Sequence, residues 1–196
     1  MPRPPNPEVR ARLLEGGHAI VHELGFHGCG VQDITNAAKV PKGSFYNYFE
    51  SKESFAAEIL EQYWQSIRKR HAPVLRDVRL EPLVRVQKFF HGLSRDHRTN
   101  GFAPGCLIGN LSLELSAGSE GVREKLLDVM RRWQAALADC LAEAQTRGEL
   151  AGDVRVGELS AILVEGYEGA VMRSKIERSG KALERFEKSV LPHLLC

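Results

Sequence analysis

The chain has 196 residues, of which 43% are hydrophobic and 27% charged, with a formal net charge of +2. This apolar content excludes an intrinsically disordered chain. The sequence contains no run of about 18 apolar residues, so no transmembrane helix is predicted. The proline-rich first seven residues lack the apolar core of a secretory signal. We therefore expect a cytoplasmic protein with no membrane partner, whose four cysteines form no CxxC pair and are reduced.

The first fifty residues predict three short helices, which together form a domain over residues 1–50. Apolar residues recur every three or four positions over residues 9–24, and Gly25 then ends this helix. A second helix is expected over residues 31–38. A third is expected over about residues 43–49, after a tight turn.

Residues 51–196 are expected to form a second, larger helical domain. Ser51 is placed to cap a long helix that continues to about Ala72. Further apolar stripes follow at the helical period and no β alternation is seen, so the predicted fold is all-α with about nine helices. The later helices are expected over about residues 83–93, 104–115, 122–144, 156–171 and 183–194.

The run Lys42-Gly43-Ser44-Phe45-Tyr46-Asn47-Tyr48-Phe49 carries the most informative pattern. Phe45 and Phe49 are four residues apart and are expected to face the core, which turns Tyr46 and Asn47 outward. An outward hydroxyl, an amide and a nearby lysine suit the phosphate-lined groove of DNA. The residues alone leave a second interpretation open, in which the tyrosines are half-buried packing residues.

Residues 8–60 resemble the TetR family of transcriptional regulators. The resemblance implies a homodimer, most often a repressor, that binds a pseudo-palindromic double-stranded DNA operator and responds to a small-molecule effector. In such a dimer, residues 43–48 enter the major groove. The matching elements are Gly25-Phe26, Gly30-Val31, Ile34 with Ala37-Ala38, the run over residues 42–49, and Ser51-Lys52-Glu53. The DNA contacts that the resemblance implies are Gln32, Thr35, Lys42, Gly43, Ser44, Tyr46, Asn47, Tyr48 and Lys52.

The second half of the chain resembles the NemR-type, electrophile-responsive branch of this family, through Gly105-Cys106-Leu107, Leu111-Ser112 and Glu114. In that branch a cysteine at this position is the sensing thiol, and a lysine in the penultimate helix assists it. Lys175 matches that lysine. The branch responds to quinones, maleimide-like electrophiles, aldehydes or reactive chlorine, whereas a relative binds unsaturated carboxylates, so the inducer stays open.

Cys106 has two interpretations from its local sequence. If Pro104 is the first helical residue, Cys106 lies in the first turn, where the helix dipole favours the thiolate that attacks electrophiles. Alternatively, Cys106 is a small buried apolar residue. A reversible ligand is then the alternative effector, in a pocket lined by Phe102, Trp133 and Tyr167.

The remaining cysteines and a histidine pair have simpler interpretations. Cys140 is expected in the core, Cys29 in an exposed turn, and Cys196 at a mobile C-terminus. His18 and His22 have a spacing that can bind zinc, but no third ligand is evident, so we expect no metal site. With no catalytic or cofactor-binding motif, an enzyme or a non-DNA interaction module is the least supported alternative.

The helix expected over residues 156–171 contains Gly157, Gly166 and Gly169. Each glycine costs a helix about 1 kcal/mol relative to alanine, which predicts close packing of another helix, as at a two-fold dimer interface. A cavity-lining role is the alternative. The long helix that follows Ser51 is expected to connect the DNA-binding part to the effector-binding part.

Overall fold

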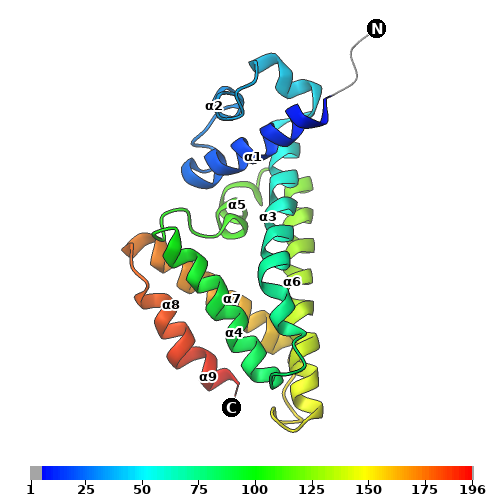
Figure 1. Ribbon diagram of the computed structural model, residues 1–196, viewed down its shortest axis with the longest axis vertical. Helices are drawn as coiled ribbons and strands as arrows, with labels where there is room; N and C mark the ends of the chain where they lie inside the picture. Colours follow the sequence, from blue (N-terminus) through cyan, green and yellow to red (C-terminus); the bar gives the residue numbers. More distant parts are fainter. Residues whose placement is uncertain (1–5, 196) are drawn as a thin grey trace. The chain divides into compact units, whose positions relative to one another are not determined.

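The computed structural model describes residues 6–195 (Figure 1). Over these residues the chain forms nine α-helices, one 3₁₀ turn and one π-helical turn, and no strand, so the all-α prediction is confirmed. No helix in this part of the chain is long and apolar enough to span a bilayer. The described residues divide into two compact units, residues 6–63 with 107–127 and residues 64–106 with 128–195.

The first unit is built around α1. The Asn6 side chain caps this helix by accepting a hydrogen bond from Glu8 N at 2.9 Å, and Gly25, with φ of +83°, ends it as predicted. The unit contains α1 (Pro7–Leu24), α2 (Val31–Ala37), the 3₁₀ turn η1 (Lys42–Asn47), α5 (Leu107–Leu115) and the first parts of α3 (Lys52–Leu75) and α6 (Glu120–Thr146).

α1 and α2 approach so closely that two α1 glycines have no room for a side chain. A Cβ atom on Gly16 would lie 2.9 Å from the Ala37 backbone, and one on Gly17 would lie 2.8 Å from the Ile34 side chain of α2 as well as 2.4 Å from the Phe55 ring. Non-bonded carbon atoms normally stay at least about 3.5 Å apart. These two glycines therefore fix where α2 crosses α1.

Phe45 and Phe49 face the core of the first unit, as their spacing predicts. Both are at most 3% exposed, and their ring centroids lie 5.5 and 5.0 Å from that of Phe55. The segment that carries them differs from the α-helix predicted over residues 43–49. It is a 3₁₀ turn, closed by bonds such as Tyr48 N to Phe45 O at 3.0 Å, which join residues three apart.

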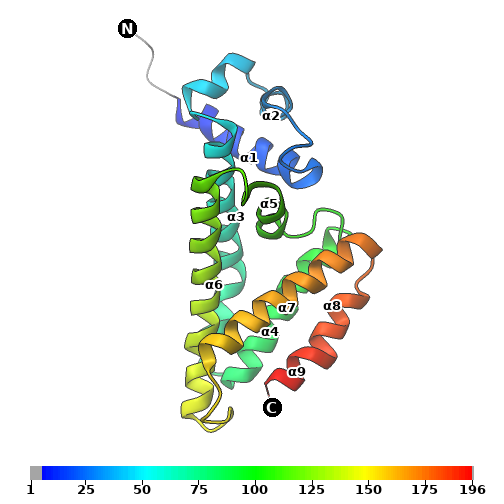
Figure 2. The same cartoon turned by 180° about the vertical axis from the view of Figure 1, so that it is seen from behind.

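The second unit is a helical bundle with an aromatic centre. The rings of Phe90, Trp133, Tyr167 and Phe186 have neighbouring centroids 5.2–6.2 Å apart. α8 and α9 run along α7 in both views (Figures 1 and 2). The unit contains α4 (Pro82–Thr99), α7 (Val156–Glu177), α8 (Lys181–Arg185), the π turn η2 (Phe186–Val190), α9 (Leu191–Leu194) and the remaining parts of α3 and α6.

The helix predicted over residues 104–115 begins later, at Leu107. Phe102 and Gly105 have φ angles of +64° and +69°, in the left-handed region that an α-helix does not contain. The proline that suggested the helix start therefore lies in an irregular loop. Cys106 directly precedes α5 and does not lie within its first turn, so that prediction is wrong.

The last helix, predicted as continuous over residues 183–194, is interrupted by η2. Leu191 N donates to Phe186 O, five residues back, in place of the usual four. Pro192 follows at once and has no N–H to continue the α-helical pattern. The chain still packs its apolar residues inward here, since Phe186 and Leu191 are at most 2% exposed.

The compact units do not divide at residue 50. α3 and α6 contribute residues to both units, and α5 belongs to the first unit although it follows residue 106. The reason is that two long helices run through both units. The predicted boundary between residues 50 and 51 marks the end of the helix-turn-helix segment. That the two sides of this boundary are separate domains stays a prediction.

Candidate nucleic-acid interface and effector site

The exposed side of η1 presents polar groups above an apolar base. Phe45 is fully buried, so the residues beside it are held outward. Tyr46 is 61% exposed, and Ser44 is half-buried. Hydroxyl, amide and ammonium groups at such positions can bond to phosphates and to base edges. The exposed set also contains Lys42, Gly43 and Asn47.

Two further predicted DNA contacts flank this set. Tyr48 is half-buried, and its hydroxyl accepts a hydrogen bond from Asn6 N at 2.9 Å, which holds the start of α1. Gln32 is exposed on α2 and donates to Asn36 Oδ1 at 2.8 Å. Tyr48 therefore combines a packing role with a partly exposed ring, and Gln32 keeps its side chain at the surface.

Thr35 and Lys52, which the sequence also nominated, have other partners. Thr35 is fully buried, and its hydroxyl donates to Val31 O at 3.0 Å within α2. The half-buried Lys52 donates to the carbonyl oxygens of Phe26 and Cys29. Its ammonium also lies 4.1 Å from the centroid of the Phe26 ring. Lys52 thus fastens the loop after α1 to the start of α3, and we remove both residues from the DNA-contact set.

The cysteines other than Cys106 are buried where they are described. The prediction of an exposed Cys29 is wrong, since its side chain is 4% exposed within the loop that Lys52 holds, and burial raises the pKa of its thiol. Cys140 is confirmed as a core residue, 3% exposed, with Sγ donating to Pro82 O at 3.3 Å. Burial raises the pKa of Cys140 to about 11. Cys196 lies outside the described residues.

Cys106 is 5% exposed and contacts an ionisable residue that sequence reasoning missed. Its thiol donates a hydrogen bond to the Glu168 carboxylate of α7. Burial raises the pKa of Glu168 to about 7, against the opposite effect of this hydrogen bond. A carboxyl group with this pKa can accept a proton near neutral pH. No local pattern marks Glu168, because one acidic residue on a helix is usually a solvated one.

Lys175, the predicted partner of Cys106, is half-buried on α7. It lies seven residues after Glu168, which is two turns, or about 10 Å along the axis of the same helix face. Glu168 itself hydrogen-bonds to Cys106 through its carboxylate. A role for Lys175 in assisting the thiol stays a prediction.

Two of the three predicted pocket residues lie together in the aromatic centre. Trp133 and Tyr167 are each 1% exposed, with ring centroids 6.2 Å apart. Trp133 Nε1 is buried and has no acceptor among residues 6–195. Phe102 is half-buried in the loop before α5, and a Cβ atom on Gly180 would lie 3.2 Å from its ring.

The histidine pair on α1 contacts Tyr63 of α3. The ring centroids of His18 and His22 lie 5.8 and 5.5 Å from that of Tyr63. Burial, and secondly the charge of His22, lowers the pKa of His18 to about 4. Across residues 6–195, no group of three or more His, Cys, Asp or Glu side chains is arranged to hold a metal ion.

Comparison with known proteins places two family regions on this chain. Residues 13–59 match the family described as bacterial regulatory proteins, tetR family. Residues 82–190 match the family described as tetracyclin repressor-like, C-terminal domain. The chain is 38% identical over 187 residues to the HTH-type transcriptional repressor DhaR of Mycobacterium sp. (strain GP1), covering 95% of this chain and 92% of that protein.

Two solved structures are similar over nearly the whole chain. The regulatory protein TetR from Rhodobacter sphaeroides matches with a TM-score of 0.87 at 34% identity, covering 94% of this chain and 98% of that one. The reduced form of E. coli NemR matches with a TM-score of 0.79 at 29% identity, covering 95% of this chain and 94% of that one. Both halves of the chain thus have counterparts in helical DNA-binding regulators.

Proposed function

Because this chain belongs to the TetR family of DNA-binding transcriptional regulators, we propose that it is a repressor released from its operator when an electrophile or oxidant modifies Cys106. Members of this family regulate transcription and are not enzymes. The observation that carries the finer proposal is the hydrogen bond from the buried Cys106 thiol to Glu168. This pairs a nucleophile with a group that can take up its proton.

The exposed side of η1 and the surface of α2 form the proposed DNA contact. Replacing Lys42 and Tyr46 together by alanine should abolish operator binding and leave the fold intact, since both side chains are exposed. Lys88→Ala, at an exposed lysine of α4, is the matched control and should bind normally. Loss of binding in both would contradict the assignment. The proposed contacts are Gln32, Lys42, Gly43, Ser44, Tyr46, Asn47 and Tyr48.

The proposed reaction with N-ethylmaleimide begins with loss of the thiol proton, because the thiolate is the attacking species. The Cys106 proton passes to Glu168. The sulfur then forms a bond to one alkene carbon, and the alkene electron pair moves to the other carbon as an enolate. That carbon takes up a proton, which Glu168 can return. The pKa of about 7 suits both proton transfers.

A route from Cys106 to the DNA-binding segment runs along α5 and across a hydrogen bond. Cys106 immediately precedes this helix, whose Glu114 side chain accepts a hydrogen bond from His27 N at 2.8 Å in the loop after α1. We propose that an adduct on Cys106 displaces the start of α5 and so disturbs this loop. A coupling free energy of about 3 kcal/mol would weaken operator binding roughly 150-fold.

We also propose that the active form is a homodimer with α7 at its interface. Ile162 and Ile176 of α7 are 46% and 75% exposed, and Gly169 lies midway between them, seven residues from each. Apart from the adjacent backbone of α7, a Cβ atom on Gly169 would meet no atom of residues 6–195 within 4 Å. Gly166 is explained within the chain, because the Phe186 ring lies 3.3 Å from its Cβ position. A second copy of α7 would bury this exposed apolar stripe.

Sedimentation equilibrium tests the dimer. Ile176→Glu places a charge in the proposed interface and should shift the wild-type dimer towards monomer. Leu113→Glu introduces the same charge at an apolar residue of α5 that is 82% exposed, and should leave the dimer intact. A monomeric wild-type protein, or an unchanged dimer in Ile176→Glu, would contradict this interface.

The electrophile response is tested by gel shift on an operator selected from random DNA by the protein itself. N-ethylmaleimide and hypochlorite should abolish binding by the wild type and by Cys140→Ser, the control for a second buried thiol, but not by Cys106→Ser. Wild-type binding that survives both reagents would discard the thiol sensor. A reversible ligand would then be the effector, and the unpaired Trp133 Nε1 next to Tyr167 marks where it would bind.

A further inference from the structure

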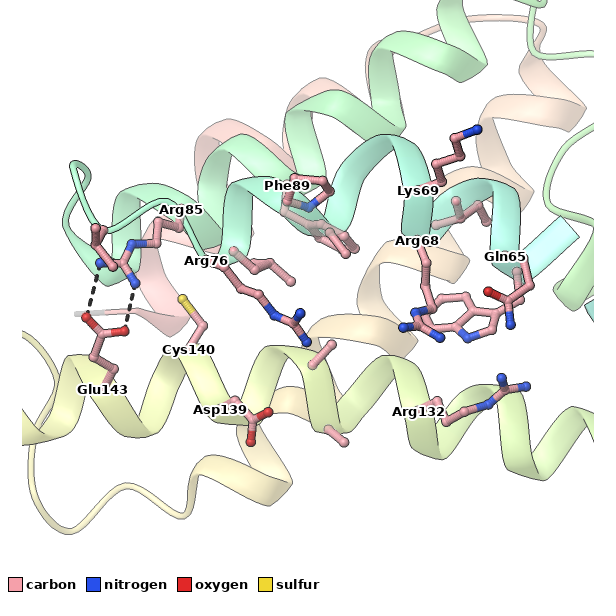
Figure 3. A pocket seen from close by; sticks show the side chains of 18 residues that line it. Gln65, Arg68, Lys69, Arg76, Arg85, Phe89, Arg132, Asp139, Cys140 and Glu143 are labelled. Carbon is pink, nitrogen blue, oxygen red and sulfur yellow. Dashed lines mark hydrogen bonds and ion pairs between the residues drawn. The ribbon is translucent and has the colours of Figure 1, made fainter.

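A groove of about 980 Å³ lies within the second unit, between α3, α4 and α6 (Figure 3). Its floor is apolar. Trp64, Ile67 and Phe89 line it, and each is at most 4% exposed, so their exposed edges are small but continuous with the core. This volume falls at the upper end of the range for small-molecule sites. Neither Cys106 nor Glu168 lines it.

Charged side chains surround this floor, and several are already paired. The Arg85 guanidinium bonds to both Glu143 carboxylate oxygens, at 2.7 and 3.1 Å. Arg132 forms an ion pair with Asp128 at 2.8 Å. These pairs leave little net charge at their own positions. The charged lining residues are Arg68, Lys69, Arg76, Arg85, Arg132, Asp139 and Glu143.

Arg68 and Arg76 are the exception. Over residues 6–195, neither guanidinium lies within ion-pair distance of a carboxylate. Figure 3 shows both side chains, Arg68 on α3 and Arg76 directly after it, directed towards α6, where Asp139 is the remaining carboxylate. Lys69 points away from α6 in the same view. The space between α3 and α6 therefore carries two guanidinium groups that form no ion pair, with the Asp139 carboxylate nearby, above an apolar floor.

We propose that this groove binds an organic anion with an extended apolar body, such as a medium-chain carboxylate. Its head group would lie between Arg68 and Arg76, because a planar guanidinium can bind a carboxylate through two parallel hydrogen bonds. Its chain would lie against Trp64 and Phe89, which removes apolar surface from water. A small anion would leave most of the groove unfilled, and a neutral apolar molecule would leave both guanidinium groups without a partner.

This site goes beyond the proposed electrophile response, because Cys106 takes no part in it. It nevertheless has a direct covalent link to the DNA-binding segment. Residues of α3 from Trp64 to Leu75 line the groove, and Lys52, the first residue of the same helix, fastens the loop after α1. A ligand that binds the groove therefore acts on a helix that both units share.

Isothermal titration calorimetry of the full chain with octanoate tests the proposal. Arg68→Gln/Arg76→Gln should weaken octanoate binding at least about tenfold, which is 1.4 kcal/mol or more. The matched control is Arg95→Gln/Arg131→Gln, which removes the same charge from exposed residues of α4 and α6 outside the groove and should bind like the wild type. Acetate and octan-1-ol should each bind the wild type far more weakly than octanoate.

Three results would overturn the site. One is the absence of octanoate binding to the wild type at millimolar concentration. Another is equal weakening in both double variants, which would indicate attraction by net charge alone. The third is octan-1-ol binding as tightly as octanoate, which would remove the role of the anion. Cys106→Ser should bind octanoate like the wild type, so this titration is read independently of the electrophile response.

Discussion

Replacing Lys52 by methionine should destabilise the protein without removing a DNA contact. Methionine keeps the length of the side chain but removes the ammonium that donates to Phe26 O and Cys29 O and lies over the Phe26 ring. A hydrogen bond from a charged donor contributes about 1.5–3 kcal/mol and a cation–π contact about 0.5–1 kcal/mol, less where water competes. Because Lys52 is half-buried, we expect a total loss of about 2 kcal/mol.

Two measurements separate a fastening role from a phosphate contact. In a chain of this length each kcal/mol changes Tm by about 2–4 °C, so Lys52→Met should lower Tm by about 4–8 °C. Each phosphate contact adds about 0.9 to the slope of log K against log salt for operator binding. Lys42→Ala should lower that slope by about 0.9 per protomer, whereas Lys52→Met should leave it unchanged. A Lys52→Met protein with a normal Tm and a reduced slope would refute the reasoning.

Three further predictions test other parts of the structure. Gly17→Ala should severely destabilise the first unit in urea unfolding, because its methyl group would lie 2.4 Å from the Phe55 ring. The control Gly121→Ala has open space around its Cβ and should be neutral or stabilising by about 0.4–1 kcal/mol. The pKa of Glu168, about 7, is above its ordinary value of 4.5, so the folded protein loses stability as pH rises through this interval. Glu168→Gln should therefore stabilise the protein by about 3 kcal/mol at pH 8 and by about 1 kcal/mol at pH 5, and an equal gain at both would count against the buried carboxylate. The pKa of His18, about 4, is below its ordinary value of 6.5, so stability is lost as pH falls through that range. The Tm of His18→Asn should differ less between pH 7 and pH 4.5 than the Tm of the wild type does. An unchanged difference in Tm would exclude His18 as the source of the acid sensitivity.

The helices could be predicted from the sequence because apolar periodicity reports directly which face of a helix is buried. The inward direction of Phe45 and Phe49 followed from their spacing, and Gly25 ended α1 as its position indicated. The start of α5 did not follow. Pro104 favours a helix start, but the left-handed backbone of Gly105 is set by how the loop closes, which no local pattern reveals.

The candidate sites were only partly predictable, because partners come from distant parts of the chain. Thr35 and Lys52 occupy positions in the motif that suggest DNA contact, yet the first lies inside the core and the second reaches a loop 23 to 26 residues earlier. The Cys29 carbonyl accepts one of these bonds, and its side chain is buried. Glu168 becomes notable only beside Cys106, 62 positions before it in the chain. Local sequence indicates which groups are reactive, and the packing decides which groups they meet.

The membership of α5 in the first unit bears on how regulators of this kind can be recombined. A chimaera joined at residue 50 would transplant the helix-turn-helix segment but leave behind Glu114, which holds His27 N at 2.8 Å. The transplanted loop after α1 would then depend on whatever side chain the host protein offers at the equivalent helix. Exchange of DNA specificity between relatives therefore requires grafting residues 107–127 together with the N-terminal segment, or matching the acidic residue that α5 supplies.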